Sequence, residues 1–457
     1  MVEKRPFLAG RLKRHQPGDE QQHHDDARPG SLSLEIPSSP IDEVKLDVSN
    51  LPWECSYEEL RAAGMPLSKL DGSALSPVPY GVASSSNRVF EAKLSFIPGG
   101  CFLSVSTCHA FVDAWGFIVI MDMWSRCCRE IQAAPPPARP AGSKPEPAAR
   151  SDDDGGSRPA ALFGSKPTAD EYESLRRRPE LWQLLGLDWR HRDRDDEQGP
   201  QAPAPFQHPA AVKTCMFSVS PAGLAAIKQM ATPQPAAPGG EPQWISTKDA
   251  LVAFLWRSII RARAPSWTDD DRRGQSMVSV AIDGRRALSP AIPLSYIGNV
   301  VFCCLTWLPV EQLVARDDDD AGTGLAAAAL AIRRSIAGRA RDPRLLADAV
   351  RLAAGLPDVG EGAALGNAFT SWFARDLVTT SVVDLPIYDL DFGSTFGGQA
   401  SRPEFFRMPR GQFDGICMVQ PKQRDGVVDV ILSLEPDQMA RLMADGEFRE
   451  HMAFLSE

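Results

Sequence analysis

A histidine and an aspartate lie inside one of the most apolar stretches of the chain, the segment STCHAFVDAWG at residues 106–116. Six of the seven histidines stand among charged residues, glutamines, prolines or chain-end residues, and only His109 is surrounded by hydrophobic neighbours. A titratable group in such a setting needs polar partners or a chemical purpose. Near pH 7 an imidazole is substantially neutral and can accept a proton, so His109 is a candidate general base.

The His-x-x-x-Asp spacing alone identifies nothing, because it also begins at His15 and His191, in polar segments. The surroundings of His109 are more informative. A strand-like alternation precedes it and a helix entry at Trp115 follows, which places it at a strand-to-helix junction, a rigid support for a functional side chain. The alternative is a core histidine bonded to a backbone carbonyl, with Asp113 as the N-cap of the next helix.

The elements around this segment follow from hydrophobic periodicity and turn residues. Residues 88–110 predict two strands joined at a Pro-Gly-Gly turn, and residues 113–132 predict an apolar helix that becomes polar at its far end. Residues 246–264 predict a helix capped by Ser246 or Thr247. Its core-facing side is expected to carry Leu251, Phe254, Leu255 and Ile259. Further predictions are strands over 275–283 and 426–435 and a terminal helix over 435–455.

A chain of 457 residues is longer than one hydrophobic core usually organises, so two α/β domains are expected. We predict an N-terminal domain over 1–190, a crossover over 190–210 and a C-terminal domain over 211–457. Segments rich in Pro, Ala, Gly and charge predict disordered insertions. These insertions are 133–161, 190–205, 232–242 and 316–324.

Composition excludes several classes of protein. The net charge of −10 argues against nucleic acid as a partner. The nine cysteines have no disulfide-type spacing and no zinc-type pairing with histidine, so we expect no metal and a reducing compartment. The N-terminus lacks the apolar core of a signal peptide, and no apolar run reaches the ~18–20 residues of a membrane helix. We therefore expect a soluble, cytoplasmic protein without a membrane partner.

Several other segments occur in an order that resembles one known family. They are PFLAGRL (6–12), STKDALVAFLWRSIIRAR (246–263), VAIDGRRAL (280–288), YIGNVV (296–301), TTSVVDLPIYDLDFG (379–393) and PKQRDGVVDVILSLEPDQMARL (421–442). Together with STCHAFVDAWG they resemble the BAHD acyltransferases, and in particular their fungal members. The resemblance implies a two-domain chloramphenicol-acetyltransferase-like α/β fold, with mixed sheets and a solvent channel between the domains.

The resemblance implies an acyl-CoA-dependent O-acyltransferase in which His109 is the general base and the acceptor attacks the thioester directly. No acyl-enzyme is implied. Cys108 lies next to His109, but adjacent side chains of a strand point to opposite faces, which disfavours it as a nucleophile. Asp113 is expected to pair with an arginine of the Asp-x-Arg segment, namely Arg285, with Arg286 as the alternative.

The family's second motif is present as Asp391-Phe392-Gly393. By resemblance, Asp391 and Gly393 give structural support away from the histidine, and Thr380 donates a hydrogen bond to the oxyanion. Ser381 and Asn299 are expected to bind the co-substrate. The chain departs from the family at Ser394 and Val382, where tryptophan is common. Losing one oxyanion donor can cost ~2.7–4 kcal/mol, so another donor or a slow turnover is expected.

The expected substrates are acyl-CoA, which is not a permanently bound cofactor, and a small alcohol or amine of secondary metabolism, acted on by a monomer. The alternatives are a catalytically weak relative that binds CoA or a metabolite, and a peptide-synthetase-type condensing enzyme. The second is disfavoured by Cys108 before the histidine and Ala114 after the aspartate. In the family a first strand and helix precede the segment that PFLAGRL resembles, whereas here it begins at residue 6. The resemblance therefore implies either an exposed edge on the first sheet or an incomplete gene model.

Overall fold

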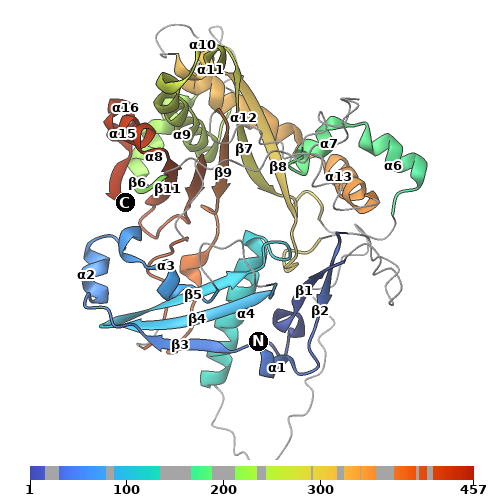
Figure 1. Cartoon of the computed structure of the whole chain (residues 1–457), viewed down its shortest axis with the longest axis vertical. Helices are drawn as coiled ribbons and strands as arrows, with labels where there is room; N and C mark the ends of the chain where they lie inside the picture. Colours follow the sequence, from blue (N-terminus) through green and yellow to red (C-terminus); the bar gives the residue numbers. More distant parts are fainter. Residues whose placement is uncertain are drawn as a thin grey trace, which may run out of the picture.

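The computed structural model describes twelve stretches of the chain (Figure 1). They are residues 1–15, 30–78, 87–133, 166–187, 212–233, 243–289, 292–315, 324–339, 341–356, 375–397, 401–408 and 415–457. The four predicted insertions fall almost entirely outside these stretches.

Two lobes are visible in Figure 1, each built around one sheet. The N-terminal lobe contains the three-stranded sheet β3-β4-β5 and the long helix α4. The elements up to residue 184 are η1 Pro6–Ala9, β1 Arg11–Arg14, β2 Leu32–Glu35, α1 Pro40–Glu43, β3 Leu46–Asn50, α2 Tyr57–Ala62, η2 Leu67–Lys69, α3 Gly72–Leu75, β4 Phe90–Ile97, β5 Gly100–Thr107, α4 Ala114–Ala133, α6 Ala169–Arg176 and α7 Pro179–Leu184.

The C-terminal lobe contains a seven-stranded mixed sheet in the order β12-β6-β11-β10-β9-β7-β8. Its elements are β6 Lys213–Val219, α8 Pro221–Ala231, α9 Thr247–Arg263, η4 Ala264–Ser266, α10 Asp269–Arg272, β7 Gln275–Asp283, β8 Val301–Pro309, α11 Val310–Val314, α12 Gly324–Arg339, α13 Pro343–Gly355, β9 Leu377–Ser381, η5 Ile387–Asp389, β10 Ile416–Val419, β11 Val428–Leu434, α15 Pro436–Ala444, α16 Gly446–His451 and β12 Ala453–Ser456.

The hairpin that leads to His109 forms as predicted. β4 and β5 pair antiparallel across a turn at which Gly99 has a φ of +82°, a conformation that glycine adopts without strain. β3 pairs with β4 on the other side and forms the edge of this sheet, and four of its five residues are exposed.

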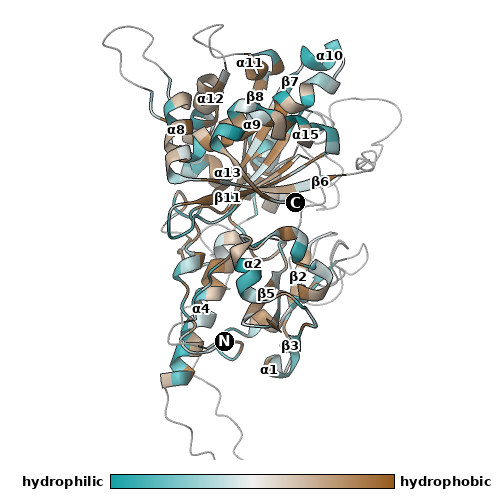
Figure 2. Ribbon diagram, turned by 90° about the vertical axis from the view of Figure 1, so that its left-hand side faces the viewer, coloured by the Kyte–Doolittle hydropathy of each residue, from teal (hydrophilic) through white to brown (hydrophobic). Residues whose placement is uncertain are grey.

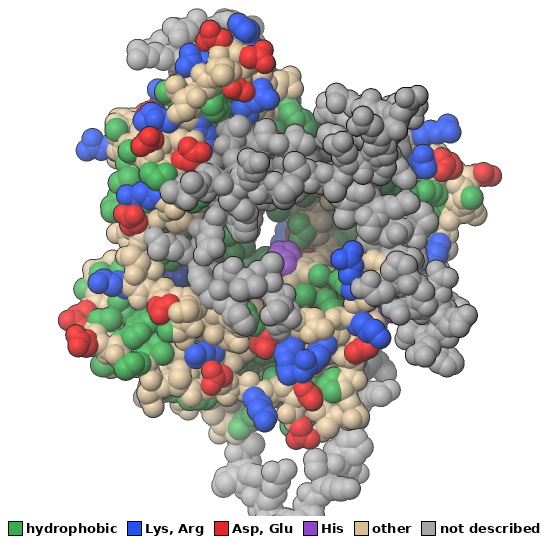
Figure 3. All heavy atoms as spheres, viewed as in Figure 1, with side chains coloured by type: hydrophobic (Ala, Val, Ile, Leu, Met, Phe, Trp, Pro, Cys, Tyr) green, Lys and Arg blue, Asp and Glu red, His purple; other side chains and the backbone are tan. Residues whose placement is uncertain are grey.

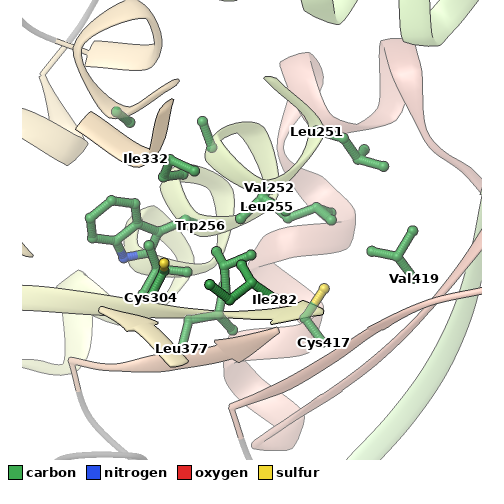
Figure 4. Close-up of a cluster of buried hydrophobic side chains, with 14 of the residues drawn as sticks. Leu251, Val252, Leu255, Trp256, Ile282, Cys304, Ile332, Leu377, Cys417 and Val419 are labelled. Carbon is green, nitrogen blue, oxygen red and sulfur yellow. The ribbon is translucent and has the colours of Figure 1, made fainter. Parts of the chain in front are cut away.

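Helix α9 is the centre of the larger core. Of the two predicted caps, Ser246 and Thr247, the N-cap is Ser246, which forms a capping box with Asp249. Leu251, Phe254, Leu255 and Ile259 are buried as expected, but the burial is not limited to their face, because every residue from 249 to 260 is buried. The reason is that α8, α11, α12 and α15 contact α9 while the sheet lies beneath it. Figure 4 shows side chains of α9 pointing toward strand residues such as Ile282 and Cys417.

Hydrophobic residues are concentrated in the strands and inner helices, and hydrophilic residues on the outer helices (Figure 2). The helices α6 and α7 come before the predicted boundary at residue 190. However, Leu175 and Trp182 belong to the same buried cluster as α9, and α7 contacts β8 and α13. The boundary itself stays a prediction.

The predicted terminal helix is wrong in its length. It breaks at Asp445, whose side chain accepts a 2.9 Å hydrogen bond from the amide of Phe448 and so begins a second helix, α16. The chain then extends into β12, which pairs antiparallel with β6. Hydrophobic periodicity continues through the Asp-Gly break because buried residues lie on both sides of it, Leu442 before and Phe448 after.

Candidate active site

His109 lies in the short connection between the end of β5 and the start of α4. Amide groups of Phe111 and Val112 donate to the carbonyl of Cys108 at 2.9 and 3.0 Å, which closes a tight turn. The turn leaves His109 exposed and buries Val112 and Asp113. The predicted strand-to-helix junction is confirmed.

The carboxylate of Asp113 is buried, with 2% of the residue exposed, and both of its oxygens are fully engaged. Arg285 donates to them through two nitrogens, at 2.8 and 2.9 Å. The amide of Gly116 donates at 2.8 Å, and the amide of Val300 at 2.9 Å. Asp113 is therefore both the N-cap of α4 and one half of a bidentate ion pair. Four donors thus leave neither carboxylate oxygen of Asp113 without a partner.

Arg285 is fully buried and uses all five of its N–H groups. Besides Asp113, it donates to the carbonyls of Tyr296 at 3.2 Å and Gly298 at 2.6 Å, and to a carboxylate oxygen of Asp283 at 2.9 Å. Arg286 is exposed. The structure thus pairs Asp113 with Arg285 and not with the alternative.

Residues 294–300, which we call the strap, run alongside the start of α4. The indole nitrogen of Trp115 donates to the carbonyl of Leu294 at 2.8 Å. Gly116 packs so closely that a β-carbon there would lie 2.0 Å from the carbonyl oxygen of Ile297. This contact requires glycine, because no side chain fits between the helix and the backbone of the strap.

The strap also holds the turn that carries His109. The side-chain amide of Asn299 donates to the backbone carbonyl of His109 at 2.6 Å, and Val112 forms a β-bridge with Gly298. The backbone of His109 is therefore fixed from the C-terminal lobe while its ring stays exposed. The surface is hollowed near the middle of the face in Figure 3, between the lobes, and a histidine side chain lies at the edge of this hollow.

Sequence reasoning missed Trp115, Gly116 and the carbonyls of Tyr296 and Gly298 as parts of this arrangement. A glycine inside an apolar helical segment was the available signal, because such a glycine costs about 1 kcal/mol relative to alanine and so indicates a close contact. Which backbone makes that contact depends on the fold.

Thr380 and Ser381 end β9 and point to opposite faces of the sheet. Ser381 pairs in register with Val419, which belongs to the core beneath α9. Its hydroxyl is buried and has no hydrogen-bond partner among the described residues. Thr380 pairs in register with Met418 and lies half-buried on the face away from α9.

The Asp-Phe-Gly segment packs against the far end of α4. Arg129 donates to the carbonyl of Asp391, and Gln132 donates to the carbonyl of Phe392 at 3.0 Å. At 1.5 Å per residue, this end of α4 is roughly 22–27 Å from the helix start beside His109. Asp391 bonds the amide of Gly393 at 2.8 Å, and Gly393 has a φ of +64°. The segment is thus a local turn, remote from the histidine.

Metal-ligand clusters, membrane-spanning helices and disulfides are the other features to consider in the described part of the chain. No group of three or more metal-type ligands occurs there. No helix among the described residues is long and apolar enough to span a bilayer. All nine cysteines lie in described stretches and none forms a disulfide. Burial raises the pKa of Cys304 to about 12, so this thiol is not an activated nucleophile.

Two family models match the chain along most of its length. The Transferase family matches residues 211–449, and the trichothecene 3-O-acetyltransferase-like N-terminal domain matches residues 1–128. Because the first of these models covers more than half of the chain, the chain belongs to the Transferase family. The resemblance to the fungal BAHD acyltransferases is thereby confirmed, and the protein is an acyltransferase.

The chain is 35% identical to an eremophilane O-acetyltransferase of Penicillium rubens, over 98% of this chain and 88% of the relative. It is 33% identical to an eremophilane O-acetyltransferase of Penicillium roqueforti, with the same coverage. Among solved structures, the F. sporotrichioides TRI101 complexed with coenzyme A and T-2 matches with a TM-score of 0.71 at 23% identity, covering 99% of this chain and 89% of that one. This match confirms the two-sheet acyltransferase fold.

Proposed function

We propose that the protein transfers an acyl group, specifically acetyl, from acyl-CoA to a hydroxyl group of a secondary metabolite, with His109 as the general base. Two relatives that match nearly the whole chain are named for acetylation of eremophilanes, which supports an eremophilane-type alcohol as acceptor. Coenzyme A in the structures of TRI101 supports a CoA thioester as donor. CoA enters and leaves as a substrate.

The observation that carries this proposal is the complete engagement of Asp113. Because Arg285 and two backbone amides occupy both carboxylate oxygens, Asp113 cannot also orient or relay a proton for His109. It supports the turn, and His109 is the exposed titratable group of the motif. A base on a rigid turn needs no rearrangement before it accepts a proton.

The reaction balances without a covalent enzyme intermediate. The imidazole of His109 takes the hydroxyl proton while the acceptor oxygen attacks the thioester carbonyl. The tetrahedral oxyanion collapses, the C–S bond breaks, and the CoA thiolate receives the proton from the imidazolium. General-base catalysis of this kind typically contributes ~10²–10⁴ in rate.

Thr380 is our candidate donor to the oxyanion. Thr380 is the next-to-last residue of β9, it is half-buried, and it lies on the sheet face away from α9. We propose that a solvent channel between the lobes brings thioester and alcohol to His109, with Asn299 on the co-substrate side. Ser381 does not fit its predicted co-substrate role, because its hydroxyl is buried on the α9 face of the sheet. The bond from Asn299 to the carbonyl of His109 supports a positioning role for Asn299 as well.

We further propose that the protein acts as a monomer in the cytoplasm. One chain supplies both the turn of His109 and the strap that holds it, so a second copy is not required. Nine unpaired cysteines, four of them buried, are typical of a reducing compartment.

The test is incubation of the purified full chain with acetyl-CoA and a panel of hydroxylated terpenoids, with free thiol and product mass measured together. Thiol release matched by an acetylated product in wild type, and lost in His109→Ala, would support the proposal. CoA binding without thiol release in either form would instead indicate a catalytically weak binder. A requirement for acceptor bound to a carrier protein would indicate a condensing enzyme.

A further inference from the structure

The large sheet has one face toward α9 and the other toward the N-terminal lobe (Figure 2). Thr380, our candidate oxyanion donor, lies on the second face and pairs in register with Met418 on β10. On the other side of β9, Thr379 pairs with Val280 of β7, so the register brings Ala281 to the level of Thr380. Neighbouring strands lie ~4.8 Å apart, so a group bound at Thr380 has Met418 on one side and Ala281 on the other.

Beyond Met418 this face of the sheet is closed by buried side chains. Met418 pairs with Ile431 on β11, and Ile431 pairs with Met216 on β6, so the three stand in one row. Ile431 is 1% exposed and Met216 is fully buried, and Leu67 of η2 packs with them from the N-terminal lobe. Met418 packs against this cluster but is itself only half-buried. Part of its side chain is therefore accessible.

An ion pair fastens the two lobes together on this closed side. Arg407 pairs with Asp429 of β11 at 3.0 Å, and both side chains are buried. The same guanidinium donates to the carbonyls of Met65 at 3.1 Å and Gly64 at 2.8 Å, both in the N-terminal lobe. Asp429 precedes Ile431 by two residues and so lies on the same face of the sheet. The N-terminal lobe is thus held against the sheet here, which leaves little depth behind Met418.

The side of Ala281 is open by comparison. Ala281 pairs in register with Cys303 on β8, the edge strand, and both residues are half-buried. Val301, on the same face of β8, is 41% exposed. Alanine and cysteine have small side chains, so this half of the face has room for a bulky group. Asn299, which holds the turn of His109, precedes Val301 by two residues, so the open side adjoins the candidate base.

The tetrahedral carbon of the proposed reaction carries the oxyanion, the CoA sulfur, the acceptor oxygen and the acyl chain. With the oxyanion at Thr380, the acyl chain and the acceptor need separate spaces. The closed side fits only a short chain, whereas the open side, next to His109, fits the body of an alcohol.

We propose that Met418, backed by Ile431 and Leu67, limits the transferred group to a short acyl chain such as acetyl, and that the acceptor lies on the side of Ala281. This role of Met418 rests on the proposed function, because it locates the acyl chain relative to Thr380. A methionine side chain is flexible, but the cluster behind it leaves it no room to retreat. Truncation to alanine would remove everything beyond the β-carbon and open room for a chain a few methylenes longer.

The experiment measures kcat/KM for acetyl-CoA and for hexanoyl-CoA, at a saturating concentration of a hydroxylated terpenoid that wild type acetylates. Thiol release and product mass are followed together. The variants are Met418→Ala and Met418→Val, the second of which keeps a β-branched residue suited to a strand. Met230→Ala is the matched control, because Met230 is 40% exposed on α8, a helix that contacts α9.

Both Met418 variants are expected to raise the ratio of hexanoyl to acetyl transfer at least tenfold, since one methylene in an apolar pocket is worth about 10–200-fold in kcat/KM. Met230→Ala should leave this ratio unchanged. Ala281→Val should raise the acceptor KM several-fold without changing the ratio.

An unchanged ratio in both Met418 variants, in a protein whose wild type transfers acetyl, would overturn this role of Met418 alone. An acceptor KM in Ala281→Val equal to that of wild type would overturn the placement of the acceptor. No thiol release by wild type with either CoA ester would overturn the proposed function, and the role of Met418 with it.

Discussion

The ion pair between Asp113 and Arg285 makes the sharpest stability prediction. In Arg285→Met the guanidinium disappears while the buried carboxylate of Asp113, with a side chain 1% exposed, keeps only the two amide donors. Breaking a buried pair by removing one partner costs about 3–5 kcal/mol. At ~2–4 °C per kcal/mol for a domain of 150–250 residues, the expected fall in melting temperature is roughly 6–20 °C.

The assay is thermal unfolding followed by circular dichroism, with Arg286→Met as the matched control. Arg286 is the adjacent exposed arginine, so its substitution should change the free energy of unfolding by less than about 0.5 kcal/mol. The double variant Asp113→Asn/Arg285→Met removes both charges and should lose less than the sum of the two single variants. If Arg285→Met melts within a degree or so of Arg286→Met, the pair does not hold the turn as we argue.

Three further predictions follow from separate contacts. Gly116→Ala should destabilise the fold by about 1–3 kcal/mol, because its β-carbon would meet the carbonyl of Ile297. Gly338→Ala, whose β-carbon would lie in open space, should stabilise α12 by up to about 1 kcal/mol. Equal urea midpoints of unfolding for the two variants would contradict both expectations. Thr380→Val should lower kcat by about 10²–10³, and Thr380→Ser should restore most of it, if the hydroxyl binds the oxyanion. Burial raises the pKa of Glu404, but hydrogen bonds from Arg61 and Tyr57 outweigh it and hold that pKa below its ordinary value. The ionised carboxylate of Glu404 therefore stabilises the fold above the ordinary glutamate pKa, and this stabilisation is lost as pH falls through the lower pKa of the folded state. The difference in melting temperature between wild type and Glu404→Gln should shrink between about pH 6 and pH 3. A difference that stays constant over this range would contradict the role of these hydrogen bonds.

Local patterns predicted the elements that carry the site. The alternation around the Pro-Gly-Gly turn predicted β4 and β5, and the capping residues of α9 were correct because capping depends on neighbours three residues away. The position of His109 at a junction also follows from local order along the chain.

What could not be predicted depends on which segments meet in space. The burial of α9 on all sides results from four other helices, and the break at Asp445 is hidden by apolar residues on both sides of it. Likewise, no pattern in the sequence indicates that Arg285 divides its five donors among Asp113, Asp283 and two carbonyls of the strap.

The central claim is that His109 is the base and that the rest of its turn is structural support. The most direct measurement compares single-turnover thiol release from acetyl-CoA, at a saturating acceptor, in wild type and His109→Ala, with CoA affinity determined on the same samples. We expect the rate to fall by about 10² or more while CoA affinity stays within a few-fold. A His109→Ala protein that releases thiol and forms product at nearly the wild-type rate would contradict the account.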